Sequence, residues 1–492
     1  MHRLLPLFVM FGALGLAQDP AALSQQGKQA MAERRFGDAA KIYAQLAELV
    51  PNNPGLLLNQ GMALSMAGND PAAIAPLEKA VELEPRIFPA WMFLGGAYLR
   101  LGQPAKAVAP LEKAFELDGN HPQVRGMLGD AYQQLGRPRD ALGHWQALAG
   151  VNPQDPVIWV MVIQSYQGLA GEAFSALQEK APESAEMVRL LADLRLAQQQ
   201  YPSALYLYRL ANEREPSMRG VHAAMAEIYR ATGHADWAAT AEAAEAELGE
   251  PDCSTATLEC DFLAGRLEKV AMAKGVDEQS LLWRAKAASA LADRAFQKLD
   301  ATPDSTRKYE LLASLFAEQK RNAESAAEWK KALAAEPGNQ VYQAQYATQL
   351  YLARDNAAAR PLIEKMLAAS PNDAQWNFFL GDIHLQALDA EKAAPLLEKA
   401  VAADANLLPA RHALGRAYMS LEEPEKAIPH LRAALEIDQD GSLHYQLAQA
   451  LIRTGKREEA RAPMEVSRKL QQSLQAQQAE AQEMEITAPT AR

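Results

Sequence analysis

Residues 88–121 read FPAWMFLGGAYLRLGQPAKAVAPLEKAFELDGNH, and this 34-residue pattern recurs before and after it without a slip. A repeat of roughly 20 to 50 residues is typical of a solenoid, in which each unit packs against its neighbours. Two helices and two turns account for 34 residues well. The pattern therefore predicts an all-α array of helical hairpins. Its recurring positions are Gly27, Gly61, Gly95 and Gly129, then Ala39, Ala73, Ala107 and Ala141, then the bulky Tyr43, Leu77, Leu111 and Trp145.

The length and composition favour such an array over a single core. One hydrophobic core stops growing near roughly 250 to 300 residues, whereas this chain has 492. Its 49% hydrophobic and 22% charged residues are ordinary for a folded protein. The formal net charge of -12 argues against nucleic-acid partners, because contact with phosphates requires a concentrated basic face.

The N-terminus has the pattern of a secretory signal peptide over residues 1–17. Arg3 supplies a positive start, residues 4–16 form an apolar run, and small residues precede Gln18. An uncleaved anchor is the alternative, but the run is shorter than the roughly 20 residues that cross a bilayer. We therefore expect export to the periplasm or beyond the cell, and a mature chain without an integral membrane span.

Breaks in the repeat divide the rest of the chain. An N-terminal array of about seven units, the fifth of them shortened, is expected over residues 18–250. A C-terminal array of about five units is expected over residues 306–470. Residues 251–305 predict an atypical helical connector, with two degenerate units as the alternative. Residues 471–492, rich in Gln, Glu and Ala, predict a polar capping helix with a frayed end.

The connector contains both cysteines, Cys253 and Cys260. In a regular helix their Cα atoms would be roughly 10 Å apart, too far for a disulfide, so a bridge requires at least one of them in a turn. Export favours a structural disulfide. Two free thiols or a metal pair are the alternatives. Beyond the cysteines, the apolar residues predict one helix near 262–270 and a longer helix over 281–299.

Two successive units show the order of small and bulky residues most clearly. The first carries Trp91, Leu94, Gly95, Tyr98, Ala107, Leu111 and Ala114, and the second carries Leu128, Gly129, Tyr132, Ala141, Trp145 and Pro153. This order resembles the tetratricopeptide repeat, as found in exported bacterial-type proteins, over most of residues 20–250 and 306–470. The resemblance implies a right-handed superhelix of antiparallel hairpins. Its first helices would line a concave groove that binds extended peptides or partner helices.

Helical phase and the geometry of that family together predict which side chains face the groove. Methionine suits apolar recognition because it is deformable, and aromatic side chains anchor peptides or stack on sugars. Tight packing within the superhelix, or an error of one residue in the phase, is the alternative for the methionines. The predicted groove residues are Leu58, Met62, Met66, Met92, Leu99 and Arg100 in the first array, and Tyr351, Phe378, Leu385, Met419, Tyr445 and Ile452 in the second.

The sequence shows no catalytic set. Gly455-Lys456 lacks the glycine-rich cradle of a phosphate loop, and no His-Glu-x-x-His pair occurs. His412, His430 and His444 are spaced too widely for a zinc site. We therefore expect no catalytic residue, no cofactor and no metal.

Two functions fit these observations. The favoured one is a non-enzymatic scaffold or adaptor outside the cytoplasm, which binds protein or peptide partners in its grooves within an envelope-associated complex. The alternative is a carbohydrate-handling accessory protein of cell-envelope or exopolysaccharide assembly, whose aromatic side chains stack on sugar rings. The two differ in the ligand and share the fold.

Overall fold

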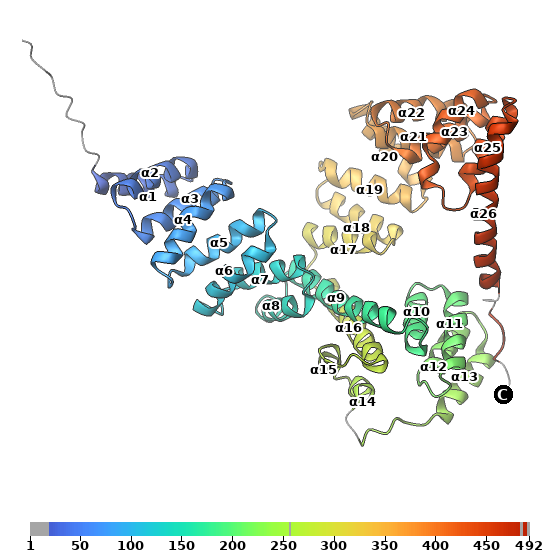
Figure 1. Cartoon of the computed structure of the whole chain (residues 1–492), viewed down its shortest axis with the longest axis horizontal. Coiled ribbons are helices and arrows are strands. Elements are labelled where there is room, and N and C mark those ends of the chain that lie inside the picture. The colour runs from blue at the N-terminus through green and yellow to red at the C-terminus, as the bar shows by residue number, and fades with distance from the viewer. Residues whose placement is uncertain (1–18, 255–256, 483–485, 490–492) are drawn as a thin grey trace, which may run out of the picture. The chain divides into compact units, whose positions relative to one another are not determined.

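Helical hairpins follow one another along the whole described chain (Figure 1). The structure, a computed structural model, describes residues 19–254, 257–482 and 486–489, so the expected signal peptide lies outside the described residues. Within these ranges there are 26 α-helices, one short 3-10 helix and no β-strand. The all-α hairpin architecture expected from the repeat is confirmed.

The first hairpins keep the 34-residue spacing. Their first helices begin at Pro20, Pro54, Phe88 and Pro122, in step with the repeat unit that begins at Phe88. The fifth hairpin lacks a second helix, because α9 continues for 25 residues. The helices are α1 (Pro20–Ala32), α2 (Phe36–Leu49), α3 (Pro54–Met66), α4 (Asp70–Leu83), α5 (Phe88–Arg100), α6 (Pro104–Leu117), α7 (Pro122–Gln134), α8 (Pro138–Val151) and α9 (Pro156–Lys180).

The next helices include the segment expected as a connector. Two regular hairpins precede it, and a long helix ends it. The single helix expected near 262–270 is wrong: two short helices lie there, because Gly265 adopts a left-handed conformation with φ +73° and turns the chain. These elements are α10 (Ala185–Ala197), α11 (Tyr201–Arg214), α12 (Val221–Ala231), α13 (Ala235–Glu247), α14 (Leu258–Leu263), α15 (Leu267–Ala271) and α16 (Glu278–Asp300).

The remaining helices again form hairpins in a second register. Their first helices begin 34 residues apart, at Thr306, Gln340, Ala374, Leu408 and Ser442. They are α17 (Thr306–Glu318), α18 (Asn322–Ala335), α19 (Gln340–Leu352), α20 (Asn356–Ala369), α21 (Ala374–Gln386), α22 (Ala390–Ala403), α23 (Leu408–Ser420), α24 (Pro424–Ala433), the 3-10 helix η1 (Leu435–Ile437), α25 (Ser442–Arg453) and α26 (Arg457–Gln482).

The chain divides into two compact units. One comprises the residues up to Gly171 together with Ala288–Phe296, and the other comprises Glu172–Ala287 and the residues from Gln297 onward. The long helices α9 and α16 each contribute residues to both units. These units are defined by packing, whereas the boundaries expected at residues 250 and 305 rest on the sequence repeat and stay a prediction.

Within the second unit, α16 packs on the end of α9 and on α10. Leu281 and Leu282 join a buried cluster with Leu177, Met187 and Leu190. Lys286 on α16 forms an ion pair of 2.6 Å with Asp193 on α10. The Tyr208 hydroxyl on α11 donates to the same carboxylate over 2.6 Å. The long helix of the expected connector, α16, therefore packs against the sixth hairpin, α10 and α11.

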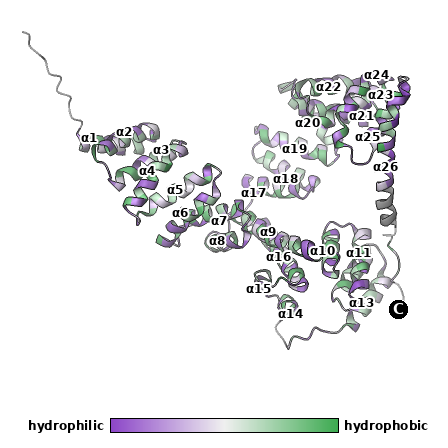
Figure 2. Ribbon diagram, in the orientation of Figure 1, coloured by the Kyte–Doolittle hydropathy of each residue, from purple (hydrophilic) through white to green (hydrophobic). Residues whose placement is uncertain are grey.

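In several hairpins the two helices approach each other closely at a glycine. A Cβ placed on Gly61 or Gly95 would lie 2.4 Å from the Cγ of Leu77 or Leu111, and on Gly129 it would lie 2.4 Å from Trp145 Cε2. Gly381 and Gly415 meet Leu397 and Leu431 in the same way. The bulky side chain thus occupies the space that a Cβ would need. Figure 2 shows apolar residues spread over all hairpins instead of gathered in one helix.

Gly129 and Gly126 lie on the same helix and provide a matched test of this approach. We expect Gly129→Ala to lower the free energy of unfolding by about 1 to 3 kcal/mol, because the rigid indole of Trp145 must move. Gly126→Ala has open space around its Cβ and should raise the free energy of unfolding by about 0.5 to 1 kcal/mol through helix propensity. Urea unfolding followed by circular dichroism measures both, and shifts of equal sign would contradict the packing account.

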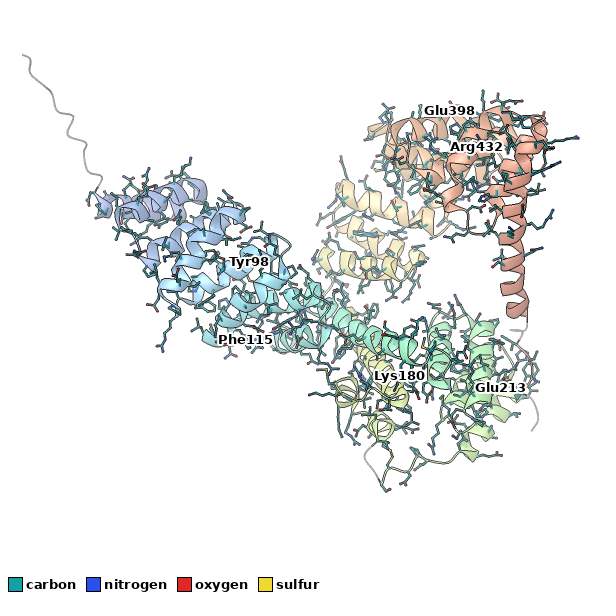
Figure 3. The ribbon with its side chains drawn as sticks, viewed as in Figure 1. Tyr98, Phe115, Lys180, Glu213, Glu398 and Arg432 are labelled. Carbon is teal, nitrogen blue, oxygen red and sulfur yellow. A yellow bond between two sulfur atoms is a disulfide. The ribbon has the colours of Figure 1, made fainter. Side chains whose placement is uncertain are left out.

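A hydrogen bond between successive hairpins also recurs. The hydroxyls of Tyr98 and Tyr132 donate to Glu78 and Glu112 over 2.7 and 2.6 Å, each 20 residues earlier in the chain. Tyr418 donates to Glu398 over 2.5 Å in the same way. The tyrosine lies on a first helix and the glutamate on the preceding second helix. Figure 3 labels Tyr98 and Glu398, one member of each of two such pairs.

These tyrosines make stability sensitive to high pH. Burial and the hydrogen bond to Glu78 raise the pKa of Tyr98 to about 12, from about 10 in an unfolded chain. The folded state therefore holds this proton more tightly. The resulting stabilisation is complete below pH ~10 and is lost as the pH rises toward about 12.

We expect Tyr98→Phe to lower the free energy of unfolding by about 1 kcal/mol at pH 8, because a hydrogen bond is lost. The difference from the natural chain should shrink between pH ~10 and ~12. Urea unfolding at stepped pH measures it. A difference that stays constant across this window would show that the Tyr98 proton is not involved.

Candidate binding surfaces

The first helices of neighbouring hairpins contact one another directly. α5 contacts both α3 and α7, and α23 contacts both α21 and α25. The predicted groove residues lie on these first helices and on α19. We call the surface of α3 and α5 the N-terminal groove and that of α19, α21, α23 and α25 the C-terminal groove.

The N-terminal groove keeps most of its predicted apolar side chains accessible. Met66 is 46% exposed, and Leu58, Met62 and Leu99 are half-buried. Met92 was predicted in the groove, and this is wrong: it is only 9% exposed. Its helix, α5, contacts the first helices α3 and α7.

Arg100 is held in place at the end of α5. Its Nε and Nη2 donate to the two carboxylate oxygens of Asp70, each over 2.8 Å, and Nη2 also donates to the Ser65 hydroxyl. The hydrogen bonds that Asp70 accepts, first from Arg100 and then from the Ser65 hydroxyl, hold the pKa of the Asp70 carboxyl below its usual value. A bidentate pair of this kind fixes the plane of the guanidinium, while about half of the Arg100 side chain stays exposed.

Asp70 was not among the predicted groove residues, although its spacing from Arg100 recurs in the repeat. Asp70 begins a second helix, and Arg100, 30 residues later, ends the next first helix. The same spacing joins Asn356 to Gln386 over 2.8 Å. Contacts between these two positions follow from the repeat geometry and could have been sought in every unit.

The C-terminal groove is less open than predicted. The Tyr351 ring stacks on Phe379 at 3.9 Å, and its hydroxyl donates to Asp382 over 2.9 Å. Phe378, 6.2 Å from the Tyr351 ring, is half-buried. Leu385 was predicted in the groove, and this is wrong: it is 4% exposed, because it packs in the cluster formed by α22 to α25.

The last predicted residues lie at the end of the C-terminal groove. Met419 is half-buried, whereas Tyr445 and Ile452 are 45% and 37% exposed. Ile452 lies 20 residues after Arg432, and so takes the place that tyrosine has in other hairpins. Tyr445 is therefore the predicted aromatic residue of this groove with the most accessible ring.

The two cysteines are joined. Cys253 lies in a turn and Cys260 in α14, with 5.8 Å between their Cα atoms and a bond between their sulfurs. The Thr257 hydroxyl accepts a hydrogen bond from the Cys260 amide and begins the helix. The bridge therefore attaches the chain after α13 to the first turn of α14.

A pocket of about 300 Å³ near this bridge was not predicted. It is lined by Glu186, Glu215 and Glu259, by Arg189 and Arg219, and by Trp283, among others. Arg189 is 4% exposed and lies 5.7 Å from the centre of the Trp283 ring. Its Nη1 donates to the Arg219 carbonyl. The pocket combines cations and carboxylates that largely neutralise each other.

Neither a metal cluster nor a membrane helix is found in the described ranges. No three His, Cys, Asp or Glu side chains gather there in a way that could hold a metal ion. No helix among these residues has the length and apolar character needed to cross a membrane. These findings concern residues 19–254, 257–482 and 486–489.

Family comparisons agree with the repeat geometry. Models described as tetratricopeptide repeat match residues 24–89, 71–122 and 98–161 in the first part of the chain. They match residues 347–407 and 408–440 in the second part. The chain is a tetratricopeptide-repeat protein. Its Gly95 and Leu111 form the close approach within a hairpin, and its Tyr98 forms the hydrogen bond between hairpins.

Curated relatives share only a short part of this tetratricopeptide-repeat protein. The small glutamine-rich tetratricopeptide repeat-containing protein 2 of Mycosarcoma maydis is 31% identical over 81 residues, which are 16% of this chain and 23% of that protein. The heat-shock protein cognate (HSC) co-chaperone sgt12 of Aspergillus fumigatus is 33% identical over 73 residues, 15% of this chain and 21% of that protein. The chain thus spans less than a quarter of the length of either relative.

Solved structures with similar repeats are more distant in sequence. MamA from Desulfovibrio magneticus RS-1 is 23% identical, with a TM-score of 0.31, covering 35% of this chain and 98% of that one. The P58(IPK) TPR domain is 14% identical, with a TM-score of 0.23, covering 83% of this chain and 99% of that one.

Removing the disulfide should loosen α14. We expect Cys253→Ser with Cys260→Ser to lower the local stability around α14 by about 2 kcal/mol, since the closed loop restricts the unfolded chain. Amide hydrogen exchange measures this locally. Treatment of the natural chain with a reductant should give the same loss, and no effect in the double variant. Equal protection with and without reductant would contradict the bridge.

Proposed function

We propose that this tetratricopeptide-repeat protein is a non-enzymatic scaffold that binds segments of partner proteins along its N-terminal groove. The observations that carry the proposal are the accessible methionine surface of α3 and the fixed guanidinium of Arg100 at the end of α5. Met66 is nearly half exposed, and Met62 and Leu58 are half-buried next to it along α3. Exposed apolar surface that gathers on one helix face is typical of interaction sites.

The methionines supply the apolar part of recognition. A partner side chain that covers Met62 and Met66 would remove apolar area from water, at roughly 25 cal/mol for each Å². The flexible thioether side chains adapt to partners of different shape. The N-terminal groove therefore suits apolar side chains of an extended segment or of a helix.

Arg100 supplies the polar part. Asp70 neutralises its charge and fixes its plane. A guanidinium that is already paired with a carboxylate attracts a second carboxylate weakly, whereas an exposed N–H edge suits a neutral carbonyl oxygen. We therefore propose that backbone carbonyls of the partner segment are recognised here.

The C-terminal groove gives the carbohydrate alternative little support. Stacking on a sugar needs an open aromatic face, and Phe379 already covers the Tyr351 ring. The Tyr351 hydroxyl is engaged by Asp382. Among the predicted aromatic residues, Tyr445 is the more accessible ring. We therefore keep protein binding as the proposal, and treat glycan binding as an outcome that would overturn it.

Export is part of the proposal. The pattern of residues 1–17 is that of a signal peptide, and disulfides such as Cys253–Cys260 persist in oxidising compartments. Both observations support a protein that acts outside the cytoplasm. We propose that it acts there in an envelope-associated complex.

Site-specific crosslinking tests the N-terminal groove. A photoreactive side chain at position 66 should crosslink a discrete protein partner in the envelope fraction of the source cells. The same group at position 388 is the control, since Leu388 is an exposed apolar residue in a turn outside both grooves. Adding Met62→Ser should lower the position-66 crosslink by about tenfold, because apolar burial worth roughly 1.5 kcal/mol is lost.

Two results would overturn the proposal. One is an equal set of crosslinked proteins from positions 66 and 388. The other is retention of polysaccharide alone by the purified chain, with no protein crosslink from position 66.

A further inference from the structure

The described end of the chain lies against α11 and α12. Arg209 on α11 donates from Nη1 to the Thr487 hydroxyl over 2.6 Å, and from Nη2 to the Thr487 and Ala488 carbonyls. Tyr229 on α12 donates from its hydroxyl to the Thr487 carbonyl over 3.2 Å. Figure 1 shows this tail segment, residues 486–489, beside these helices.

An apolar contact precedes the polar ones. Ile486 packs against the buried cluster of α10 to α13 and is itself half-buried. Residues 486–489 form no helix or turn there. The tail segment therefore meets the hairpins through an aliphatic anchor, followed by backbone carbonyls and a hydroxyl.

The polar part of this surface replaces the recurring tyrosine–glutamate pair. Tyr229 lies 20 residues after Arg209, as Tyr98 lies 20 residues after Glu78. In three hairpins the residue on the second helix is glutamate, which accepts a hydrogen bond from the tyrosine hydroxyl. Here it is Arg209, which donates to the Tyr229 oxygen over 3.0 Å.

This exchange changes what the surface can bind. A glutamate oxygen repels a peptide carbonyl oxygen. It also accepts the one hydrogen bond that the tyrosine hydroxyl can donate. Arg209 brings donors alone, and it leaves the Tyr229 proton to point at another acceptor. Two donor groups thus converge on the Thr487 carbonyl. The arrangement recognises the backbone of an extended chain.

We propose that the α11–α12 surface is a second peptide-binding site, which takes extended segments with an aliphatic residue followed by a hydroxyl residue, and that the chain's own segment 486–489 occupies it as a resident ligand. This inference rests on the proposed function as a scaffold and deepens it. A partner segment of the same chemistry must displace the tail segment in order to bind. A tethered ligand competes at an effective concentration near millimolar, so displacement sets a threshold for partner binding.

Peptide binding to the purified full-length chain tests the proposal. The probe is a fluorescein-labelled peptide with the sequence of residues 483–492, EMEITAPTAR, followed by anisotropy. A tail variant, with Ile486→Gly, Thr487→Gly, Ala488→Gly and Pro489→Ser, should bind it at least about tenfold more tightly than the natural chain, because the tethered competitor loses its aliphatic anchor and its hydroxyl acceptor.

Arg209→Glu in the tail variant is the decisive change. It restores the glutamate that pairs with tyrosine in other hairpins, so the fold should be kept, and it should weaken peptide binding by at least about tenfold. Arg432→Glu is the matched control, since Arg432 occupies the equivalent position of α24 and pairs with Glu459 instead (Figure 3). A peptide with valine in place of Thr487 should bind less tightly than the probe, because the hydroxyl acceptor is lost.

Three results would overturn the inference. They are equal binding by the natural chain and the tail variant, equal weakening by Arg209→Glu and Arg432→Glu, and no binding by the tail variant at millimolar peptide. Each can occur while the position-66 crosslink persists, and that outcome would leave the scaffold proposal standing. Loss of the crosslink with intact peptide binding would reject the N-terminal groove and leave the second site.

Discussion

The close approach of two helices at a glycine is the constraint on which the rest of this structure depends. Gly61, Gly95 and Gly129 allow Leu77, Leu111 and Trp145 to fill the space where a Cβ would stand. These hairpins are thereby narrow enough to stack on the next at a constant spacing. Because the contact is internal to a unit, it recurs with the sequence period and is readable from it.

Contacts between hairpins follow from that stacking and are more variable. Tyrosine meets glutamate across the interface in three hairpins, glutamine meets Tyr166 in another, and Arg209 meets Tyr229 in a further one. The backbone geometry tolerates all three partners, since each forms a hydrogen bond to the hydroxyl. A change of polarity at this position can therefore serve binding without disturbing the solenoid.

The predicted groove residues show where helical phase within one helix agrees with the observed exposure of a side chain and where it does not. It placed Met66, Tyr445 and Ile452 on accessible faces. It failed for Met92 and Leu385, because exposure depends on packing between helices, and phase within one helix does not contain that information. It also missed Asp70, whose ion pair with Arg100 crosses from one hairpin to the next.

The repeat in the amino-acid sequence was sufficient to predict the all-α class, the hairpins and nearly every first-helix start, since local periodicity and close packing carry that information. The turn at Gly265, the continuous helix α9 and the compact units were not predictable in the same way. Nor was the tail segment on Arg209 and Tyr229, which joins residues 278 positions apart. Such contacts depend on which surfaces the folded hairpins bring together, and the repeat period of the sequence carries no information about them.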